Sequence, residues 1–267
     1  MARPLTELPS ALDDAVFARL SKRPVALFVD FDGTLSPIVE DPGDAALPEE
    51  TRRALERLVS RGFVAVVSGR GLDDLRTRVA VPGIVLVGSH GFEIVSPDGR
   101  RIERPEAAAF LPELDAAERT LREQLASLEG VHVERKRWAI AAHYRRAPHR
   151  GPEVERAIRQ VAGEHPSLTV SGGKKVIELR PDVDWDKGAA VRWLEGSLVP
   201  PGAVPVFIGD DLTDEDAFRE IQARGVSIVV LGEDHRETEA EFSLDGPDEV
   251  RAFLVRLGEV AGSARTG

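Results

Sequence analysis

Residues 25–34 read VALFVDFDGT, an apolar run from Val25 to Val29 that ends in two aspartates and a glycine. Short β-branched runs of this kind are typical of strands buried on both faces of a parallel sheet. Asp30 and Asp32 therefore leave the strand at its carboxyl end, the edge at which open α/β sheets bind ligands. An ordinary Asp-Gly turn would give the same residues without any chemistry. A calcium loop is excluded, because its sixth position counted from Asp30 is Leu35 instead of glycine.

Further apolar runs repeat this pattern along the chain. They cover residues 63–67, 84–87, 204–208 and 226–231. Amphipathic stretches lie between several of them; residues 48–61, for example, begin with proline, place leucines on one face and stop at Gly62. This alternation of strands and helices predicts a parallel α/β sheet that is covered by helices on both faces.

The alternation is interrupted over residues 94–181, which we interpret as a domain inserted into a core of residues 1–93 and 182–267. Apolar residues recur at helical spacing over 114–128 and 154–162. Strand patterns cover 131–134, 138–145, 168–170 and 174–180, with a Ser-Gly-Gly turn between the last two. The insert is therefore predicted to be a small α+β domain, an antiparallel sheet backed by two helices.

Composition limits the classes of function. The chain has 267 residues, of which 42% are apolar and 30% charged, with a net charge of −11 and no cysteine. The negative charge argues against general binding of nucleic acid, and the lack of cysteine excludes thiolate catalysis and suits a reducing compartment. No stretch reaches the roughly 20 apolar residues that span a bilayer, and no signal peptide is visible. We therefore expect a cytoplasmic protein without nucleic-acid or membrane partners.

A second acidic segment follows the strand predicted over 204–208. It reads Gly209-Asp210-Asp211-Leu212-Thr213-Asp214-Glu215-Asp216. Asp210 should lie near Asp30 at the same sheet edge, and crowded carboxylates repel each other unless a cation neutralises them. Oxygen ligands without His or Cys suit Mg²⁺. Helix capping would explain residues 213–216, but it does not explain Asp210.

Two other segments carry groups that could hold a phosphate. Ser68-Gly69-Arg70 follows the second predicted strand, where a hydroxyl and backbone N–H groups could receive phosphate oxygens; a plain Ser-Gly turn is the alternative. Lys187 follows Asp186, a suitable N-cap, and opens a helix that runs toward Leu194. An isolated lysine there is usually solvated, so its interest comes from the set to which it belongs.

The order of these groups resembles the haloacid dehalogenase superfamily of phosphotransferases, and the resemblance covers nearly the whole chain. It implies that Asp30 attacks phosphorus to form an aspartyl-phosphate and that Asp32 acts as general acid and then as general base. It also implies that Ser68 and Lys187 hold the phosphoryl oxygens, beside the backbone of Gly69. The implied Mg²⁺ ligands are the Asp30 side chain, the Asp32 backbone carbonyl and Asp210, with Asp211 or Asp214 in support.

Strand alternation sorts the side chains of the insert into an apolar and a polar face. The apolar face should pack on the two helices, which leaves the polar face for a ligand. The polar set is Glu134, Lys136, His143, Arg145, Lys174, Glu178 and Arg180. Mixed acids, bases and an imidazole suit a polyhydroxylated ligand, whereas an ordinary solvated face with cross-strand ion pairs would have the same composition.

The resemblance sharpens to the trehalose-6-phosphate phosphatases. The matching segments are 30–38, 68–70, 88–91, 134–136, 143–145, 174–181 and 209–216. In that family, groups of the inserted cap domain hold the sugar hydroxyls, which implies this role for Glu134, Lys136, Arg145, Lys174 and Glu178; we add His143 from the polar face. The expected enzyme is a monomeric, Mg²⁺-dependent phosphatase that converts trehalose 6-phosphate to trehalose and phosphate, the last step of trehalose biosynthesis.

Two other functions fit the same residues. One is a phosphatase of another sugar phosphate, such as sucrose 6-phosphate or a glycosyl phosphoglycerate, because fold and phosphate chemistry alone do not select the leaving group. The other is a non-catalytic sugar-phosphate sensor or a regulatory subunit of a trehalose synthase assembly. The presence of Asp30, Asp32, Lys187 and Asp210 argues against the sensor.

Overall fold

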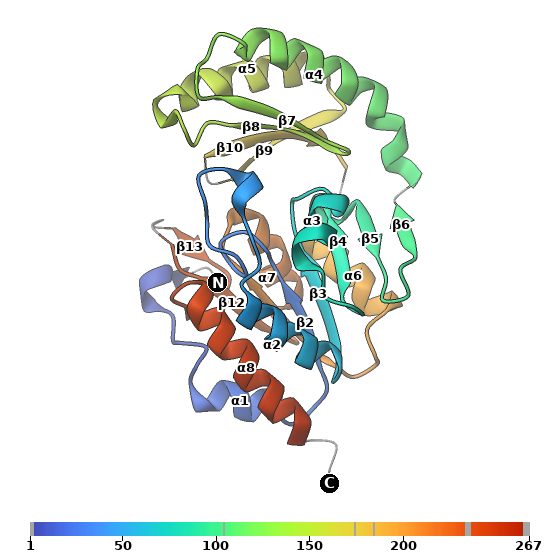
Figure 1. Ribbon diagram of the computed structural model, residues 1–267, viewed down its shortest axis with the longest axis vertical. Coiled ribbons are helices and arrows are strands. Elements are labelled where there is room, and N and C mark those ends of the chain that lie inside the picture. The colour runs from blue at the N-terminus through green and yellow to red at the C-terminus, as the bar shows by residue number, and fades with distance from the viewer. Residues whose placement is uncertain (1–2, 104, 174, 184, 233–235, 264–267) are drawn as a thin grey trace. The chain divides into compact units, whose positions relative to one another are not determined.

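The computed structural model describes residues 3–103, 105–173, 175–183, 185–232 and 236–263. The chain forms two compact units, Met1–Ile102 with Trp185–Gly267, and Glu103–Asp184. The first unit contains a long mixed sheet and the second a separate antiparallel sheet (Figure 1). Residues 94–102, which the sequence pattern assigns to the insert, belong to the first unit, and residues 182–183, which it assigns to the core, belong to the second.

The first unit is built on a sheet of eight strands in the order β14-β12-β11-β2-β3-β4-β5-β6. Neighbours from β14 to β4 run parallel, whereas β5 is antiparallel to β4. The strands are β2 Val25–Val29, β3 Phe63–Val67, β4 Val85–Gly88, β5 Glu93–Val95, β6 Arg101–Glu103, β11 Val204–Gly209, β12 Val226–Val230 and β14 Phe242–Leu244. The parallel α/β sheet predicted from the apolar runs is confirmed.

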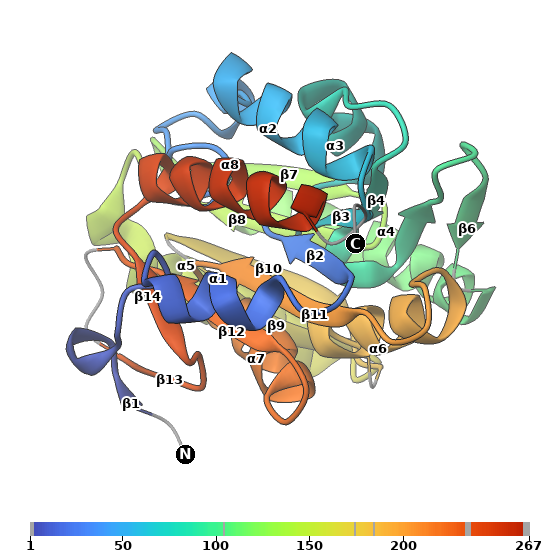
Figure 2. The ribbon, with the colours of Figure 1, turned by 90° about the horizontal axis from the view of Figure 1, so that it is seen from below.

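Helices cover both faces of this sheet (Figure 2). One face carries α1 Asp14–Leu20, α2 Glu49–Val59, α3 Leu72–Val79 and α8 Pro247–Ser263, and the other carries α6 Lys187–Ser197 and α7 Glu215–Ile221. Consecutive residues of β2 pack on opposite faces of the sheet: Leu27 packs with the first group of helices and Phe28 with the second. Burial on both faces explains why β2 is apolar throughout.

The first unit also contains several short elements. β1 Arg3–Pro4 pairs antiparallel with β13 Glu237–Thr238. Short 3-10 helices in the chain are η1 Leu5–Glu7, η2 Pro42–Asp44, η3 Ser89–Gly91, η4 Pro105–Phe110, η5 Pro148–Arg150 and η6 Leu212–Asp214, of which η4 and η5 lie in the second unit. In the parts of the chain that the structure describes, every helix is too short or too polar to cross a lipid bilayer.

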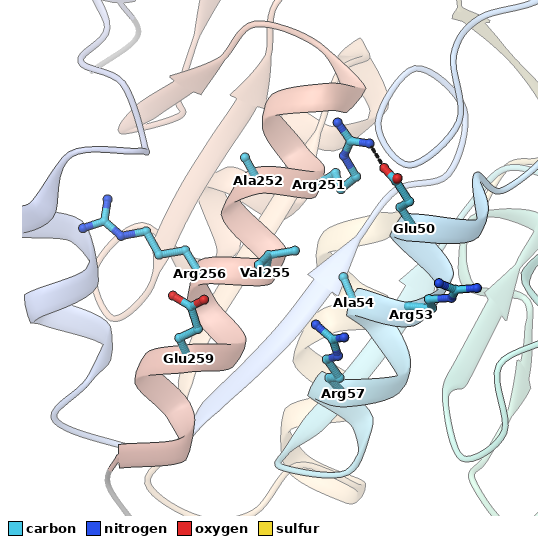
Figure 3. Close-up of a pocket in the computed structure, with 9 residues that line it drawn as sticks. All are labelled: Glu50, Arg53, Ala54, Arg57, Arg251, Ala252, Val255, Arg256 and Glu259. Atoms are coloured by element: carbon cyan, nitrogen blue, oxygen red, sulfur yellow. Dashed lines mark hydrogen bonds and ion pairs between the residues drawn. The ribbon is translucent and has the colours of Figure 1, made fainter.

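A surface groove of about 550 Å³ runs between α2 and α8 (Figure 3). Its lining residues are Glu50, Arg53, Ala54, Arg57, Arg251, Ala252, Val255, Arg256 and Glu259. An ion pair between Arg251 and Glu50 bridges the two helices. None of the predicted site residues lines this groove.

The second unit is a four-stranded antiparallel sheet in the order β7-β8-β10-β9, backed by two helices. Its elements are α4 Leu111–Leu125, β7 His132–Lys136, β8 Ala139–His143, α5 Gly151–Glu164, β9 Leu168–Gly173 and β10 Val176–Pro181. Leu121 of α4 and Ile158 of α5 are buried against Ile140 and Leu179 of the sheet. The predicted α+β insert is therefore confirmed as a fold class.

Two details of this unit differ from the expectation. β9 continues through Gly172 and Gly173, which pair with Ile177 and Val176, so the predicted Ser-Gly-Gly turn is wrong. The chain can reverse later because Lys175 adopts a left-handed conformation with φ of 60°. β8 ends at His143, and Arg145 lies in the turn that follows instead of on the strand.

Candidate active site

The carboxyl ends of β2, β3 and β11 meet at one edge of the large sheet. Val29 of β2 lies in register with Val66 of β3 and with Ile208 of β11. Asp30 comes next, and its backbone N–H donates a hydrogen bond to the Ile208 carbonyl at 2.9 Å. Residues that follow these three strands therefore start from the same edge of the sheet, where open α/β folds bind their ligands.

A buried lysine joins the acids at this edge. Lys187 Nζ donates to Asp30 Oδ1 at 2.7 Å and to Asp214 Oδ1 at 2.6 Å. Lys187 is the first residue of α6, and Asp186 caps this helix by accepting a hydrogen bond from the Ala189 N–H at 2.8 Å. The predicted N-cap at Asp186 is confirmed. It fixes the start of the helix and hence the point from which Lys187 reaches the carboxylates.

Three buried carboxylates lie close enough to share one cation. Asp30, Asp210 and Asp214 each place one oxygen within 4.8 Å of the others. Gly33 makes this approach possible, because a Cβ at this position would lie 2.1 Å from Asp210 Oδ2. Gly33 also has a φ of 82°, which favours glycine. Gly33 of the first motif therefore has a packing role at the site.

Asp214 and Asp211 have different roles in this segment. Asp214 Oδ2 accepts hydrogen bonds from the backbone N–H groups of Asp210 at 3.0 Å and Asp211 at 2.9 Å. Asp211 Oδ1 instead accepts from the Leu212 N–H at 2.7 Å and caps η6. Of the two residues expected to support the metal ligands, Asp214 lies in the carboxylate cluster and Asp211 caps η6. The Asp-x-x-Asp spacing of a capping box was the sequence signal for this arrangement.

Burial and crowding set the charges of this cluster. Burial raises the pKa of the Asp30 carboxyl well above its ordinary value; Lys187 opposes this shift, and Asp214 and Asp210 add to it. Burial acts to lower the pKa of Lys187, but Asp214 and Asp30 outweigh burial and raise this pKa above its ordinary value. Three acids around one ammonium group leave an excess of negative charge that a divalent cation would neutralise.

Asp32 is held by a residue to which the sequence analysis assigns no role. Arg70 Nε donates to Asp32 Oδ2 at 2.6 Å, and Arg70 Nη2 donates to Asp32 Oδ1 at 2.7 Å. The Arg70 backbone N–H donates to Ser68 Oγ at 3.2 Å, so the loop after β3 carries both groups. Arg70 and Asp32 are 38 positions apart in the chain, and no local pattern reveals such a pair.

The polar face of the second unit contains two pairs of interacting side chains. Glu134 of β7 and Glu178 of β10 both lie in register with Ala141 of the strand between them. Lys136 forms an ion pair with Glu178, and His143 Nε2 lies 2.8 Å from Glu134 Oε2. The hydrogen bond with His143 lowers the pKa of Glu134. Four of the predicted sugar-binding residues are thus mutual partners.

Three further predicted site residues are Gly69, Arg145 and Lys174. Gly69 lies between Ser68 and Arg70, and a Cβ there would lie 2.6 Å from Nε2 of His90. Arg145 occupies the turn after β8. Lys174 falls outside the described residues.

Sequence comparison identifies the relatives of this chain. A profile of the trehalose-phosphatase family matches residues 28–248. The chain belongs to the trehalose-phosphatase family. The trehalose-phosphate phosphatases of Mycobacterium tuberculosis and Mycobacterium marinum are 47% and 44% identical to it. Each alignment covers 96% of this chain and 67% of the relative, so this chain spans about two thirds of their length.

Solved structures agree with this assignment. The C-terminal domain of Candida albicans trehalose-6-phosphate phosphatase is 26% identical, with a TM-score of 0.81 over 96% of this chain and 98% of that one. The C-terminal domain of the Candida albicans trehalose synthase regulatory protein, 14% identical with a TM-score of 0.72 over 93% and 99%, shares the fold alone. The expected haloacid-dehalogenase-like fold is confirmed, and as a trehalose-phosphatase the chain is a phosphoric monoester hydrolase.

Proposed function

We propose that this protein hydrolyses trehalose 6-phosphate through a covalent intermediate on Asp30, with Mg²⁺ as cofactor. The main support is the buried contact between Lys187 Nζ and Asp30 Oδ1 at 2.7 Å, beside Asp210 and Asp214. Phosphoryl transfer needs an aligned nucleophile and positive charge around three phosphate oxygens. A carboxylate, an ammonium group and a cation-binding cluster at one sheet edge supply these requirements.

In the first step, an oxygen of Asp30 attacks phosphorus, and the bond between phosphorus and the sugar oxygen breaks. The Asp32 carboxyl gives its proton to this sugar oxygen, so trehalose leaves as an alcohol. An alkoxide is a poor leaving group, and such general acid catalysis typically contributes about 10²–10⁴-fold in rate. Asp32 lies two residues beyond Asp30, on the loop that leaves β2.

In the second step, a water molecule attacks the phosphorus of the aspartyl-phosphate and gives its proton to the Asp32 carboxylate. The bond between phosphorus and Asp30 breaks, which releases phosphate and restores both carboxyl groups. Lys187 and the Ser68 hydroxyl would hold the phosphoryl oxygens in both steps, together with the Gly69 N–H. A carboxylate nucleophile thus divides one difficult hydrolysis into two easier displacements.

The residues of the cluster fit a divalent cation. Side-chain oxygens of Asp30 and Asp210, with the Asp32 backbone carbonyl, would hold it, and donors that are all oxygen favour Mg²⁺. Asp214 already accepts hydrogen bonds from Lys187 and from two backbone N–H groups, so we assign it to the support of these ligands. A bound Mg²⁺ would neutralise charge that develops on the phosphoryl group.

We assign the choice of sugar to the second unit, which would serve as the cap of a catalytic core. Glu134, Lys136, His143 and Glu178 combine donors and acceptors on one sheet face, as sugar hydroxyls require. A site built to hydrogen-bond hydroxyl groups rejects analogues that leave its polar groups unpaired. Arg145 and Lys174 complete the proposed set. The proposal also includes a monomeric state, a cytoplasmic location, which the lack of cysteine favours, and no nucleic-acid partner, which the net charge of −11 favours.

Product analysis with purified protein tests this function. The protein would be incubated with trehalose 6-phosphate, sucrose 6-phosphate and a glucosyl phosphoglycerate, each with Mg²⁺ and with a chelator. We expect the fastest phosphate release from trehalose 6-phosphate, and none after the metal is removed. Faster hydrolysis of another sugar phosphate would contradict the proposed substrate, and full activity in the chelator would contradict the proposed cofactor.

A further inference from the structure

Arg70 occupies both oxygens of the Asp32 carboxyl. The two hydrogen bonds are 2.6 and 2.7 Å long, and the Arg70 side chain is only 10% exposed. A planar guanidinium in a two-point contact fixes a carboxylate more firmly than a single donor does. A carboxyl that exchanges a proton with a sugar oxygen needs one of its own oxygens free. The role proposed above for Asp32 therefore requires that Arg70 release at least one of them.

A second carboxylate already shares the guanidinium of Arg70. Asp74 lies in the first turn of α3, and its Oδ2 accepts a hydrogen bond from Arg70 Nη1 at 2.7 Å. The carbonyl of Pro42 accepts another from Arg70 Nη2 at 2.9 Å. Neither contact involves Asp32. They can therefore keep Arg70 in place while its pair with Asp32 opens.

Asp74 is itself held firmly. Arg78 Nε lies 2.8 and 2.9 Å from the two oxygens of Asp74. Arg78 also donates to the carbonyls of Gly43 in η2 and of Ala45, which directly follows η2. Burial acts to raise the pKa of Asp74, but hydrogen bonds from Arg78 and Arg70 outweigh burial and lower this pKa, so Asp74 stays charged. A fixed negative charge therefore lies permanently beside Arg70.

We propose that Asp74 is a positioning residue for proton transfer by Asp32. By sharing the positive charge of Arg70, Asp74 weakens the hold of the guanidinium on Asp32, so that an oxygen of Asp32 can be released to the departing sugar. The inference rests on the proposed function, in which Asp32 is the general acid. Without the charge of Asp74, Arg70 holds Asp32 more strongly and releases its oxygen less often, so the step that needs a proton slows.

The leaving group of the substrate separates this role from a merely structural one. Trehalose needs a proton as it leaves phosphorus, whereas 4-nitrophenolate does not. Asp74→Asn keeps the shape of the side chain and removes its charge. We expect single-turnover release of trehalose from trehalose 6-phosphate to slow about tenfold, with the first-turnover burst of nitrophenolate from 4-nitrophenyl phosphate changed by less than about twofold. Asp74→Glu restores the charge and should recover most of the loss.

The neighbouring residue provides a matched control. Asp73 lies in the same turn of α3, but its carboxylate contacts Arg101 at 2.8 Å and its side chain is 85% exposed. Asp73→Asn makes the same chemical change and should alter both rates by less than about twofold. Asp32→Asn is the positive control, and it should slow trehalose release selectively and more strongly than Asp74→Asn does.

The outcomes distinguish a failure of the role proposed for Asp74 from a failure of the role proposed for Asp32. The inference is wrong if Asp74→Asn leaves trehalose release unchanged, accelerates it, or slows both leaving groups equally. If Asp32→Asn itself shows no selectivity, the assignment of Asp32 as general acid fails, and the inference fails with it. A selective loss in both variants, with Asp73→Asn unaffected, supports the role of Asp74.

Discussion

Lys187 and Asp30 are 157 positions apart in the chain, yet Lys187 Nζ donates a hydrogen bond to Asp30 Oδ1 at 2.7 Å. The two side chains are 3% and 7% exposed. A buried ammonium group without a partner would be strongly destabilising, and Asp30 and Asp214 together compensate it. The site therefore combines an ammonium group, which stabilises the carboxylates, with an excess of negative charge, which destabilises the fold.

Asp30→Asn should abolish turnover of trehalose 6-phosphate while stabilising the metal-free protein. The amide keeps the shape of the side chain and removes one of three crowded negative charges. We expect an increase of about 1 kcal/mol in the free energy of unfolding, or roughly 2–4 °C in Tm. Thermal unfolding in a chelator measures this shift. A lower Tm for the variant would show that the Asp30–Lys187 pair outweighs the repulsion.

The Asp30→Asn variant also tests how the stability of the metal-free protein changes with pH. Because burial raises the pKa of Asp30 above its ordinary value of 3.8, the folded chain binds more protons than the unfolded chain between these two pKa values. This contribution to stability is fully present below the ordinary pKa and is lost as the pH rises through the raised pKa. Metal-free wild type should therefore lose stability relative to Asp30→Asn as the pH rises. Parallel urea-unfolding midpoints across this range would contradict the expectation.

Binding of Mg²⁺ should stabilise the fold through Asp210 and not through Asp211. At a concentration 100 times its Kd, the ion adds about 2.7 kcal/mol to the free energy of unfolding, which appears as a higher Tm. Asp210→Asn removes a proposed ligand and should abolish most of this increase. Asp211→Asn is the control, because Asp211 caps η6. An equal loss of the Mg²⁺ effect in both variants would refute the proposed ligand set.

Gly33→Ala should damage the carboxylate cluster specifically. The new Cβ would lie 2.1 Å from Asp210 Oδ2, and the backbone φ of 82° adds strain. Gly99→Ala separates the two effects, since Gly99 has a φ of 81° and nothing lies within 4 Å of its added Cβ. Strain alone costs about 1 kcal/mol or somewhat more in either variant. Only Gly33→Ala should also lose the rise in Tm on addition of Mg²⁺; retention of that rise would argue against the packing role.

Glu178→Ala should reduce activity on the sugar substrate far more than on a small aryl phosphate. The variant removes the ion-pair partner of Lys136 on the polar sheet face. We expect kcat/KM for trehalose 6-phosphate to fall about tenfold or more, with a change of less than about twofold for 4-nitrophenyl phosphate. Glu155→Ala on α5 of the same unit is a control, because Glu155 contacts the exposed Arg159. Equal losses on both substrates would remove the second unit from sugar recognition.

The elements of the large sheet could be predicted from sequence because their cause is local. A strand buried on both faces must be apolar throughout, so Val25–Val29 and Val204–Gly209 are visible as continuous runs. Their acidic ends then indicate one sheet edge. The turn near Gly172 was misplaced because glycine tolerates both a turn and a paired strand, and register with β10 decided between them.

Contacts between distant side chains could not be predicted in the same way. Arg70 meets Asp32 and Lys136 meets Glu178 only because the backbone fold brings them together. The sequence contains these residues but carries no periodic signal that pairs them. Asp214 is the intermediate case, since its capping-box spacing with Asp211 was present in the sequence and explains its inward position.

Trapping the covalent intermediate tests the central claim most directly. Enzyme would be mixed with trehalose 6-phosphate labelled with ³²P, quenched in acid within the first turnover, and digested for peptide mapping. The account predicts label on the peptide that contains Asp30, its release on incubation in mild base, and no label in Asp30→Asn. Rapid release of trehalose with no labelled peptide, or with label on a different residue, would contradict Asp30 as the nucleophile.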